Sequence, residues 1–507
     1  MQRSHAKLGA RVARATGNWT ERYLDFITPN LPTTSGGTER SQWSPGQEHQ
    51  DQHARPELQS QQEQTVPVCD VQNPTGRGQS AQAQMPQDWD RTIYDVRTNN
   101  LTDVDIDGGT AMKTKLRSGL DWKIEDLGIE GFRALMKKHV DPTTSPGHPW
   151  KELADTNGQL FGYDPILGFV GEQVETLYEA VKIRLRELAE KPFIDDINLF
   201  IKDEPHKAKK LENEAYRLIS GVGITDQMVS TIMFEELLEE VISKPGEYST
   251  MIGWGIHCEE GLLSMNRAVR SRFGQNLASA DKSSWDWTAQ PWTCSLLRRH
   301  LMWLHRHLDN SSLVQMSNHV LAMLGPKSVI SSDYKVFDII EGGMASGWKL
   351  TILGNSWMQL ILHHLAQLRA GTTGPPPLCM GDDTIQTTMP DEYWNELAAT
   401  GCILKEVNNH LDGSPYEFCG LHFGEEFYEP SYEGKHSFLL RFLEPELFRD
   451  VMISYQLLYL FDPVKLLALR RWLIISGLQD ALIDVDAWQY RLRGLSRWPL
   501  NPKPRIL

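Results

Sequence analysis

The sequence contains few cysteines and no long apolar run. Its 507 residues include six cysteines, none of which forms a Cys-x-x-Cys pair. This excludes a disulfide-rich scaffold and indicates a reducing, cytosolic setting. No run of about 18 apolar residues occurs, so no transmembrane helix is expected. The nearest stretch, 466–478, is interrupted by Arg470 and Arg471, and the first 20 residues lack the apolar block of a secretory signal.

Positive charge is also scarce. Lys and Arg number 51 against 66 Asp and Glu, which gives a formal net charge of −15. This balance excludes a protein that coats nucleic acid through bulk positive charge, so any anionic ligand must meet a local basic patch. With 40% apolar and 23% charged residues, the chain can build a large core. Its length exceeds what one core usually organises, so two or three domains or subdomains are expected.

The N-terminal part differs in composition from the rest. Residues 1–26 carry a weak helical pattern in which Arg3, Lys7, Arg11 and Arg14 form a basic stripe. The stripe is either a solvated helix face or a tether to RNA, a membrane surface or an organelle. Residues 33–87 are dominated by Gln, Ser, Gly, Pro and charge, and they predict a disordered linker.

From about Trp89 the composition is globular. Helical periodicity predicts helices over 171–188 and 228–242. Short apolar or β-branched segments predict strands at 197–201, 218–222, 336–340 and 385–388. Their irregular alternation predicts an α+β enzyme and not a doubly wound sheet. Beyond Ser437 the pattern is mostly helical.

Acidic residues at two places suggest a chemical site. Gly381-Asp382-Asp383 lies between short apolar stretches and predicts a tight hairpin turn, while Asp281 and Asp286 follow a plausible strand at 277–280. Carboxylates from two adjacent strand ends repel one another unless cations lie between them. Two Mg²⁺ ions about 3.5–4 Å apart can stabilise the attacking and leaving oxygens of a phosphoryl transfer. The motifs therefore indicate a two-metal nucleotidyl transferase, although Gly-Asp by itself could simply form the turn.

Further motifs accompany the carboxylates in a fixed order. In chain order the set is Thr144-Ser145-Pro146-Gly147, the basic cluster Lys202 to Arg217, Asp281 to Asp286, Gly342 to Asn355, Gly381-Asp382-Asp383, Cys402 to Val407, and Tyr416 to Gly420. Together these seven motifs resemble the RNA-dependent RNA polymerases of positive-strand RNA viruses, above all those of the sobemovirus and polerovirus group. The resemblance covers roughly residues 144–423.

The resemblance implies a right-hand polymerase of fingers, palm and thumb. An antiparallel palm sheet flanked by helices is expected, with a disordered N-terminal region. The implied boundaries are a largely disordered extension with a basic, helix-patterned start at 1–90, fingers with part of the palm at 91–275, palm with a fingers insertion at 276–425, and a mostly helical thumb at 426–507.

Site residues are carried over motif by motif. Asp281, Asp382 and Asp383 are implied to bind two Mg²⁺ or Mn²⁺ ions, and Lys405 to protonate the pyrophosphate leaving group. The triphosphate would meet Lys202, Lys210 and Arg217. The sugar and its 2′-hydroxyl would be checked by Asp286, Ser346, Gly347, Thr351 and Asn355. The template would meet Thr144, Ser145 and Gly147.

Each of these motifs has a plain structural reading as well: a Pro-rich turn, a solvated charged loop, a Gly-rich helix entry or a surface lysine. Trp348 and Lys349 depart from the small residues often seen at their positions in the family. Trp285 and Trp287 are expected to be packing residues.

The implied partners are an RNA template, a nascent strand and nucleoside triphosphates, together with a genome-linked viral protein and host membranes reached through other viral proteins. The implied location is the host cytoplasm, at viral replication complexes. The sequence leaves open whether synthesis begins de novo or from a protein primer. Two rivals are considered: a reverse transcriptase, disfavoured by the Asp286–Asn355 pairing and by Gly381, and a non-catalytic RNA-binding protein, disfavoured because all three carboxylates are present.

Overall fold

The structure is a computed structural model that describes residues 124–494, apart from 203–211, 213–215, 259, 307, 333, 340 and 341. Two predictions concern residues outside this set, the N-terminal extension 1–90 and Lys210.

The candidate carboxylates belong to a four-stranded sheet, here called the central sheet. Its strand order is β10 (Leu404–His410), β5 (Leu277–Lys282), β9 (Asp383–Thr387) and β8 (Leu378–Met380). All three pairings are antiparallel. The predicted strands at 277–280 and 385–388 correspond to β5 and β9, each shifted or lengthened by a residue or two.

Long helices cover the central sheet. Helix α14 (Thr351–Ala370) is buried along most of its length and packs against α12 (Pro291–Leu304), α15 (Asp391–Ala399) and β8. Helix α10 (Gly261–Phe273) packs against β9. The short α11 (Trp285–Thr288) follows β5 directly.

A second four-stranded sheet has the order β4 (Leu218–Gly221), β3 (Ile197–Ile201), β6 (Lys327–Ile330) and β7 (Val336–Ile339). Only its β3–β6 pair is parallel. The surrounding helices are α5 (Ile124–His139), α6 (Asn157–Phe161), α7 (Gln173–Glu190), α9 (Ile224–Ser243) and α13 (Asn310–Leu324). A 3-10 turn, Trp150–Glu152, and a small hairpin of β1 (Tyr163–Asp164) and β2 (Gly168–Phe169) complete this part.

Helix α9 begins earlier than its apolar periodicity predicts. It starts at Ile224 instead of Met228, because polar residues in its first turn are buried against partners from other elements. Thr225 accepts a hydrogen bond from Trp150 Nε1 at 2.8 Å, and Asp226 pairs with Arg184. Helix α7 agrees with the predicted segment within two residues at each end.

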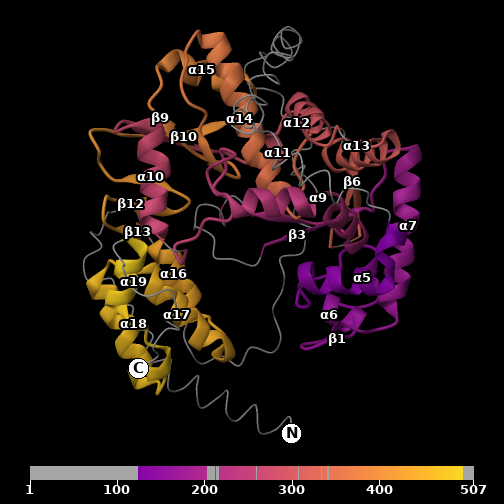
Figure 1. Cartoon of the computed structure of the whole chain (residues 1–507), viewed down its shortest axis with the longest axis horizontal. Helices are drawn as coiled ribbons and strands as arrows, with labels where there is room; N and C mark the ends of the chain where they lie inside the picture. Colours follow the sequence, from indigo (N-terminus) through magenta and orange to yellow (C-terminus); the bar gives the residue numbers. More distant parts are fainter. Residues whose placement is uncertain are drawn as a thin grey trace.

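The C-terminal part is mostly helical, as predicted. A three-stranded sheet of β11 (Tyr416–Phe418), β12 (Leu421–Phe423) and β13 (Tyr428–Pro430) precedes it. The helices are α16 (Glu433–Arg441), α17 (Phe448–Leu458), α18 (Pro463–Ile475) and α19 (Val485–Leu492), with 3-10 turns at Pro445–Leu447 and Gln479–Ala481. In Figure 1 these helices (yellow) lie on the opposite side from α5 and α6 (indigo).

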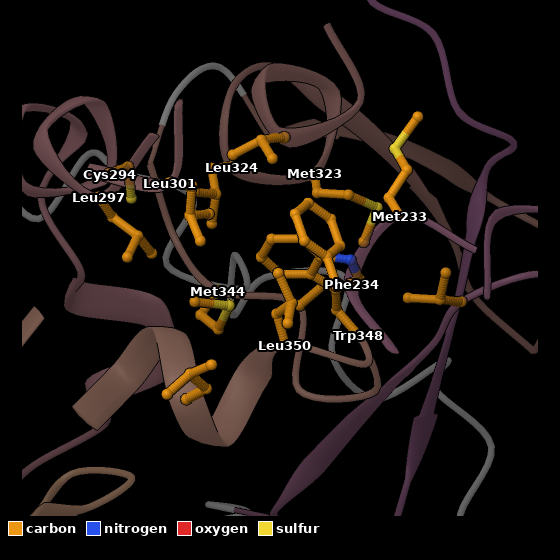
Figure 2. Packing of buried hydrophobic residues seen from close by; sticks show 14 of the residues in the cluster. Met233, Phe234, Cys294, Leu297, Leu301, Met323, Leu324, Met344, Trp348 and Leu350 are labelled. Atoms are coloured by element: carbon orange, nitrogen blue, oxygen red, sulfur yellow. The ribbon is translucent and has the colours of Figure 1, made fainter. Parts of the chain in front are cut away.

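The largest cluster of buried apolar residues holds the Gly-rich loop that precedes α14. Figure 2 shows Met344, Trp348 and Leu350 of this loop among side chains from α9, α12 and α13, such as Phe234 and Leu301. Trp348 is 3% exposed and its Nε1 donates to Ser230 Oγ at 2.9 Å. The tryptophan that departs from the family pattern therefore anchors the loop in the core.

Among the helices that the structure describes, none is both long enough and apolar enough to cross a membrane.

A buried ion-pair network fixes the segment that leads into β3. Arg184 on α7 donates to Asp226, which is fully buried, and to Asp195 Oδ1 at 2.6 Å. The Asp195 backbone N–H donates to Asp226 Oδ2 at 2.9 Å. Because α9 follows β4 directly, the network ties α7 to the strands that carry Lys202 and Arg217.

Replacing Arg184 with Met should lower the free energy of unfolding by about 3–5 kcal/mol, because Asp226 would keep a buried charge without its partner. The exposed pair Arg449–Asp480 offers a matched control, and Arg449→Met should cost roughly 1 kcal/mol or less. Urea denaturation at pH 7 compares the two variants. Equal losses would mean that the buried network contributes no more than a surface pair.

Candidate active site

The turn between β8 and β9 carries two of the predicted carboxylates. Met380 pairs with Asp383, so Gly381 and Asp382 form a two-residue hairpin turn. Gly381 has a φ of +68°, and a Cβ there would meet nothing within 4 Å. The glycine is therefore required by the backbone conformation and not by lack of space. The predicted hairpin turn is present.

Strand pairing brings the third carboxylate to the same end of the central sheet. Ala280 on β5 pairs with Thr384 on β9 in antiparallel register. Continuing this register by one residue places Asp281 opposite Asp383. The two acidic motifs therefore meet at one end of the sheet, as the sequence predicts. A hydrogen bond from Lys282 to Asp382 O, between residues 100 apart in the chain, also joins them.

The charges of these carboxylates act on one another. Burial, and after it the charge of Asp382, raises the pKa of Asp383 to about 6. Burial also raises the pKa of Asp382, with the charge of Asp281 adding to the rise and that of Lys282 opposing it. Such mutual repulsion is relieved when a cation binds between the groups.

Lys405 contacts a predicted metal ligand. The pairing of β10 with β5 is interrupted by a bulge between Leu404 and Glu406, and Lys405 lies in it. Its Nζ donates to Asp281 Oδ2, and both side chains are partly exposed, at 59% and 42%. This hydrogen bond raises the pKa of Lys405. The proposed general acid and the proposed metal ligand are thus neighbours.

The donor types at this end of the sheet fit a divalent cation. Carboxylate oxygens are the ligands that Mg²⁺ and Mn²⁺ prefer, and burial is the main cause of the raised pKa values of Asp382 and Asp383. Within the described ranges, no group of three or more His, Cys, Asp or Glu side chains converges on one point.

A buried pair lies beside the carboxylates. Asp286 on α11 accepts a hydrogen bond from Asn355 Nδ2 on α14 at 3.1 Å. Asn355 is 5% exposed, and its Oδ1 has no hydrogen-bond partner. Burial raises the pKa of Asp286, the bond from Asn355 opposes this rise, and the charge of Asp382 adds to it. The pair therefore lies within electrostatic reach of the carboxylate turn and leaves one buried acceptor free.

The Gly-rich loop before α14 is fixed to β4. Ser346 Oγ accepts a hydrogen bond from the Ser220 backbone N–H at 2.9 Å, and Gln227 Nε2 donates to Gly347 O. A Cβ at Gly347 would collide with Ser220 O, so only glycine allows this approach. Thr351 Oγ1 donates to Ala345 O and to Trp348 O, each at 2.7 Å. The hydroxyls predicted to reach the sugar thus hold the loop together in this structure.

Two of the predicted triphosphate ligands adjoin one another. The Lys202 backbone N–H donates to Arg217 O at 2.8 Å, at the end of the β3–β4 pair where the connecting segment begins and ends. The charge of Arg217 lowers the pKa of both Asp286 and Asp382, so Arg217 lies within electrostatic reach of the site.

The predicted template motif forms a loop that packs against the start of α9. Thr144 Oγ1 donates to Asp141 O at 3.0 Å, and Ser145 Oγ accepts from the Gly147 N–H at 3.3 Å. Gly147 has a φ of +70°, and a Cβ there would lie 2.8 Å from Gly223 Cα. These hydroxyls serve the loop itself, and their role toward a template stays a prediction.

The tryptophans beside the second acidic motif are packing residues, as expected. Trp285 is 4% exposed and Trp287 packs against the same core cluster. Sequence reasoning missed two other side chains, Lys282 and Ser356, which bind the carboxylate turn from its buried side. The alternation of β5 could have shown that Lys282 points away from Asp281, into the core.

Comparison with known proteins gives a consistent result. The family described as viral RNA-directed RNA-polymerase matches residues 50–262, less than half of the chain, and the match ends before Asp281. The RNA-directed RNA polymerase of mushroom bacilliform virus is 26% identical over 291 residues, which cover 54% of this chain and 68% of the relative. The replicase polyprotein P2AB of cocksfoot mottle virus is 25% identical over 307 residues, covering 56% of this chain and 30% of the relative.

Among solved structures, the sicinivirus 3Dpol RNA-dependent RNA polymerase is similar with a TM-score of 0.54. The identity is 21%, and the match covers 70% of this chain and 78% of the other. At this identity the likeness establishes the fold.

The fold is that of the right-hand polymerases, with an antiparallel sheet that brings carboxylates to one end. The matching family model and the similar viral proteins point to one group within this fold. The chain is similar to viral RNA-directed RNA polymerases, and the similar proteins include replicases of sobemovirus-like and polerovirus-like viruses. The right-hand fold and the resemblance to this family that the sequence motifs predict are both found.

The raised pKa of Asp383 predicts a pH-dependent stability. Because the folded state holds this proton more tightly than the unfolded state, Asp383 contributes stability below about pH 4 that is lost as the pH rises through about 6. Without divalent metal, Asp383→Asn should remove this part of the slope. Urea denaturation between pH 4 and 7.5, in the presence of EDTA, measures it. An unchanged slope in the variant would contradict the shifted pKa.

Proposed function

We propose that this chain carries out template-directed RNA synthesis, adding ribonucleotides to an RNA 3′ end by two-metal nucleotidyl transfer. The observation that carries the proposal is the meeting of Asp281, Asp382 and Asp383 at one end of the central sheet, within electrostatic reach of the buried Asp286–Asn355 pair. Metal-dependent transfer needs such carboxylates, and selection of ribose needs a polar pair beside them.

Asp281, Asp382 and Asp383 would hold two Mg²⁺ or Mn²⁺ ions. These ions supply charge that activates the attacking 3′-hydroxyl and stabilises the leaving pyrophosphate. Asp281 would hold a metal through its carboxylate, one oxygen of which, Oδ2, accepts a hydrogen bond from Lys405. The Lys405 ammonium has a proton to give to the leaving group, and losing the bond to Asp281 would remove the contact that raises its pKa.

Sugar selection would fall to Asp286 and Asn355. The free Asn355 Oδ1 can accept a hydrogen bond from a ribose hydroxyl, and its Nδ2 keeps Asp286 in place. A deoxynucleotide would leave this buried acceptor unpaired, which costs about 1–3 kcal/mol. Ser346, Gly347 and Thr351 support the pair by fixing the loop before α14.

The incoming triphosphate would meet Lys202, Lys210 and Arg217. Arg217 fits this role because its charge reaches Asp286 and Asp382, the groups at which the sugar and the metals would lie. Thr144, Ser145 and Gly147 would contact the template. The proposed partners are an RNA template, a nascent strand, nucleoside triphosphates, a genome-linked viral protein, and host membranes reached through other viral proteins, at replication complexes in the host cytoplasm.

The two rival functions differ from this proposal at specific residues. A reverse transcriptase would have no use for an acceptor directed at a ribose hydroxyl, so the Asp286–Asn355 pair favours RNA synthesis. A non-catalytic RNA-binding protein would have no need to gather carboxylates where burial, and after it their mutual repulsion, raises their pKa values.

Replacing Asp382 with Asn should lower RNA synthesis roughly 1,000-fold or more, which corresponds to about 4 kcal/mol of lost transition-state stabilisation. Template binding should stay within a fewfold of the wild type. Primed extension and filter binding of the same RNA measure the two quantities. Asp391→Asn, at the exposed start of α15, is the matched control and should retain full activity. Substantial synthesis by Asp382→Asn would refute the metal-ligand assignment.

Replacing Asn355 with Ala should reduce the preference for ribo- over deoxynucleotides by roughly 10-fold, as expected for losing one buried hydrogen bond. Gln359→Ala removes another buried amide from α14 and should leave the preference unchanged. Single-nucleotide incorporation on one template, with ATP or dATP, gives the ratio of kcat/KM values. A wild-type preference for dATP would refute the RNA polymerase assignment itself.

A further inference from the structure

A buried lysine lies behind the carboxylates. Lys282 ends β5 and is 5% exposed, whereas Asp281 beside it is half-buried and faces the opposite side of the strand. An ammonium group is costly to bury unless all of its donors are used. We therefore expect the buried Lys282 ammonium group to have a specific structural role beside Asp281.

All three donors of Lys282 have partners. Its Nζ donates to Ala280 O at 3.2 Å, to Asp382 O at 3.0 Å and to Thr384 Oγ1 at 2.6 Å. These acceptors come from β5, from the carboxylate turn and from β9. The lysine thus joins the strand that carries Asp281 to the hairpin that carries Asp382 and Asp383.

A second side chain holds the same turn from α14. The Gly381 backbone N–H donates to Ser356 Oγ at 3.0 Å, and Ser356 is fully buried. Its hydroxyl in turn donates to Ile352 O at 2.8 Å and accepts from Thr250 Oγ1 at 3.3 Å. Ser356 directly follows Asn355, just as Lys282 directly follows Asp281.

We infer that Lys282 and Ser356 are positioning residues that clamp the backbone of the carboxylate turn, one at the Asp382 carbonyl and the other at the Gly381 N–H. The clamp fixes where Asp382 and Asp383 point relative to Asp281, and it ties this arrangement to the helix that presents Asn355. Two-residue turns at the tip of a hairpin are otherwise among the most mobile parts of a sheet. The catalytic part of the inference rests on the proposed function, whereas the structural part does not.

Hydrogen exchange of the metal-free protein tests the clamp without any reference to activity. In Lys282→Met and Ser356→Ala, amides of residues 378–387 should exchange at least 10-fold faster than in the wild type, and Thr384→Val should show a smaller increase. Lys327→Met is the matched control, because Lys327 is another buried lysine that donates to two backbone carbonyls, those of Gly325 and Gly342. It should leave exchange over 378–387 unchanged.

Steady-state kinetics, at a temperature well below every variant's Tm, test the catalytic part. Lys282→Met should lower kcat for nucleotide addition 10- to 100-fold, while the KM for the nucleotide stays within threefold. Thr384→Val should lower kcat three- to 10-fold. Its matched control is Thr225→Val, which removes an equally buried threonine hydroxyl that accepts from Trp150 and should leave kcat unchanged.

The outcomes separate the claims. Unchanged exchange over 378–387 in both Lys282→Met and Ser356→Ala overturns the clamp. Faster exchange with kcat within twofold of the wild type overturns its role in positioning and leaves only a structural one. If Lys282→Met does not fold, Thr384→Val and Ser356→Ala decide both questions by the same criteria. A wild type that makes no RNA on any template counts against the proposed function, and the exchange result then still decides the clamp.

Discussion

The antiparallel pairing of β5 with β9 brings Asp281, Asp382 and Asp383 to one end of the central sheet, where their negative charges repel one another. Much of the surrounding structure compensates for this repulsion. Lys405 pairs with Asp281 from the solvent side, and Lys282 places its charge behind Asp382. Carboxylates held close together favour a divalent cation between them, and the metal-dependent transfer proposed above depends on this property.

The elements around the central sheet position the other residues of the proposed nucleotide site. Helix α14 presents Asn355 to Asp286, while the loop before it is anchored in the core by Trp348 and held against β4 by Ser346. Because β4 also begins beside Arg217, the loop and the proposed triphosphate ligand share one strand. These hydrogen bonds and strand β4 thus connect the proposed metal, sugar and phosphate subsites.

Much of the fold followed from local patterns. The two-residue turn at Gly381 and Asp382 was predictable because glycine and short apolar flanks specify a hairpin without outside help. Three of the four strands of the second sheet and the helix over 173–190 were predictable from local apolar patterns, whereas β6 was not predicted. The start of α9 was not, because Thr225 and Asp226 are polar and are buried only by virtue of Trp150 and Arg184, which lie far away in the chain.

The sequence by itself determined the inventory of the site: which carboxylates, cations and amides are present, in an order that identifies the polymerase family. Tertiary structure decided which of them face one another. Ser346 was expected to contact the sugar, yet its hydroxyl accepts a hydrogen bond from the Ser220 backbone N–H. Lys405 lies in a β-bulge, which no local sequence pattern predicts, and contacts Asp281 from there. The roles of Lys282 and Ser356 could not be predicted from the sequence, because they depend on partners 100 and 25 residues away in the chain. Hydrogen bonds and charge pairs between distant segments depend on burial and register, and these exist only once the chain has folded.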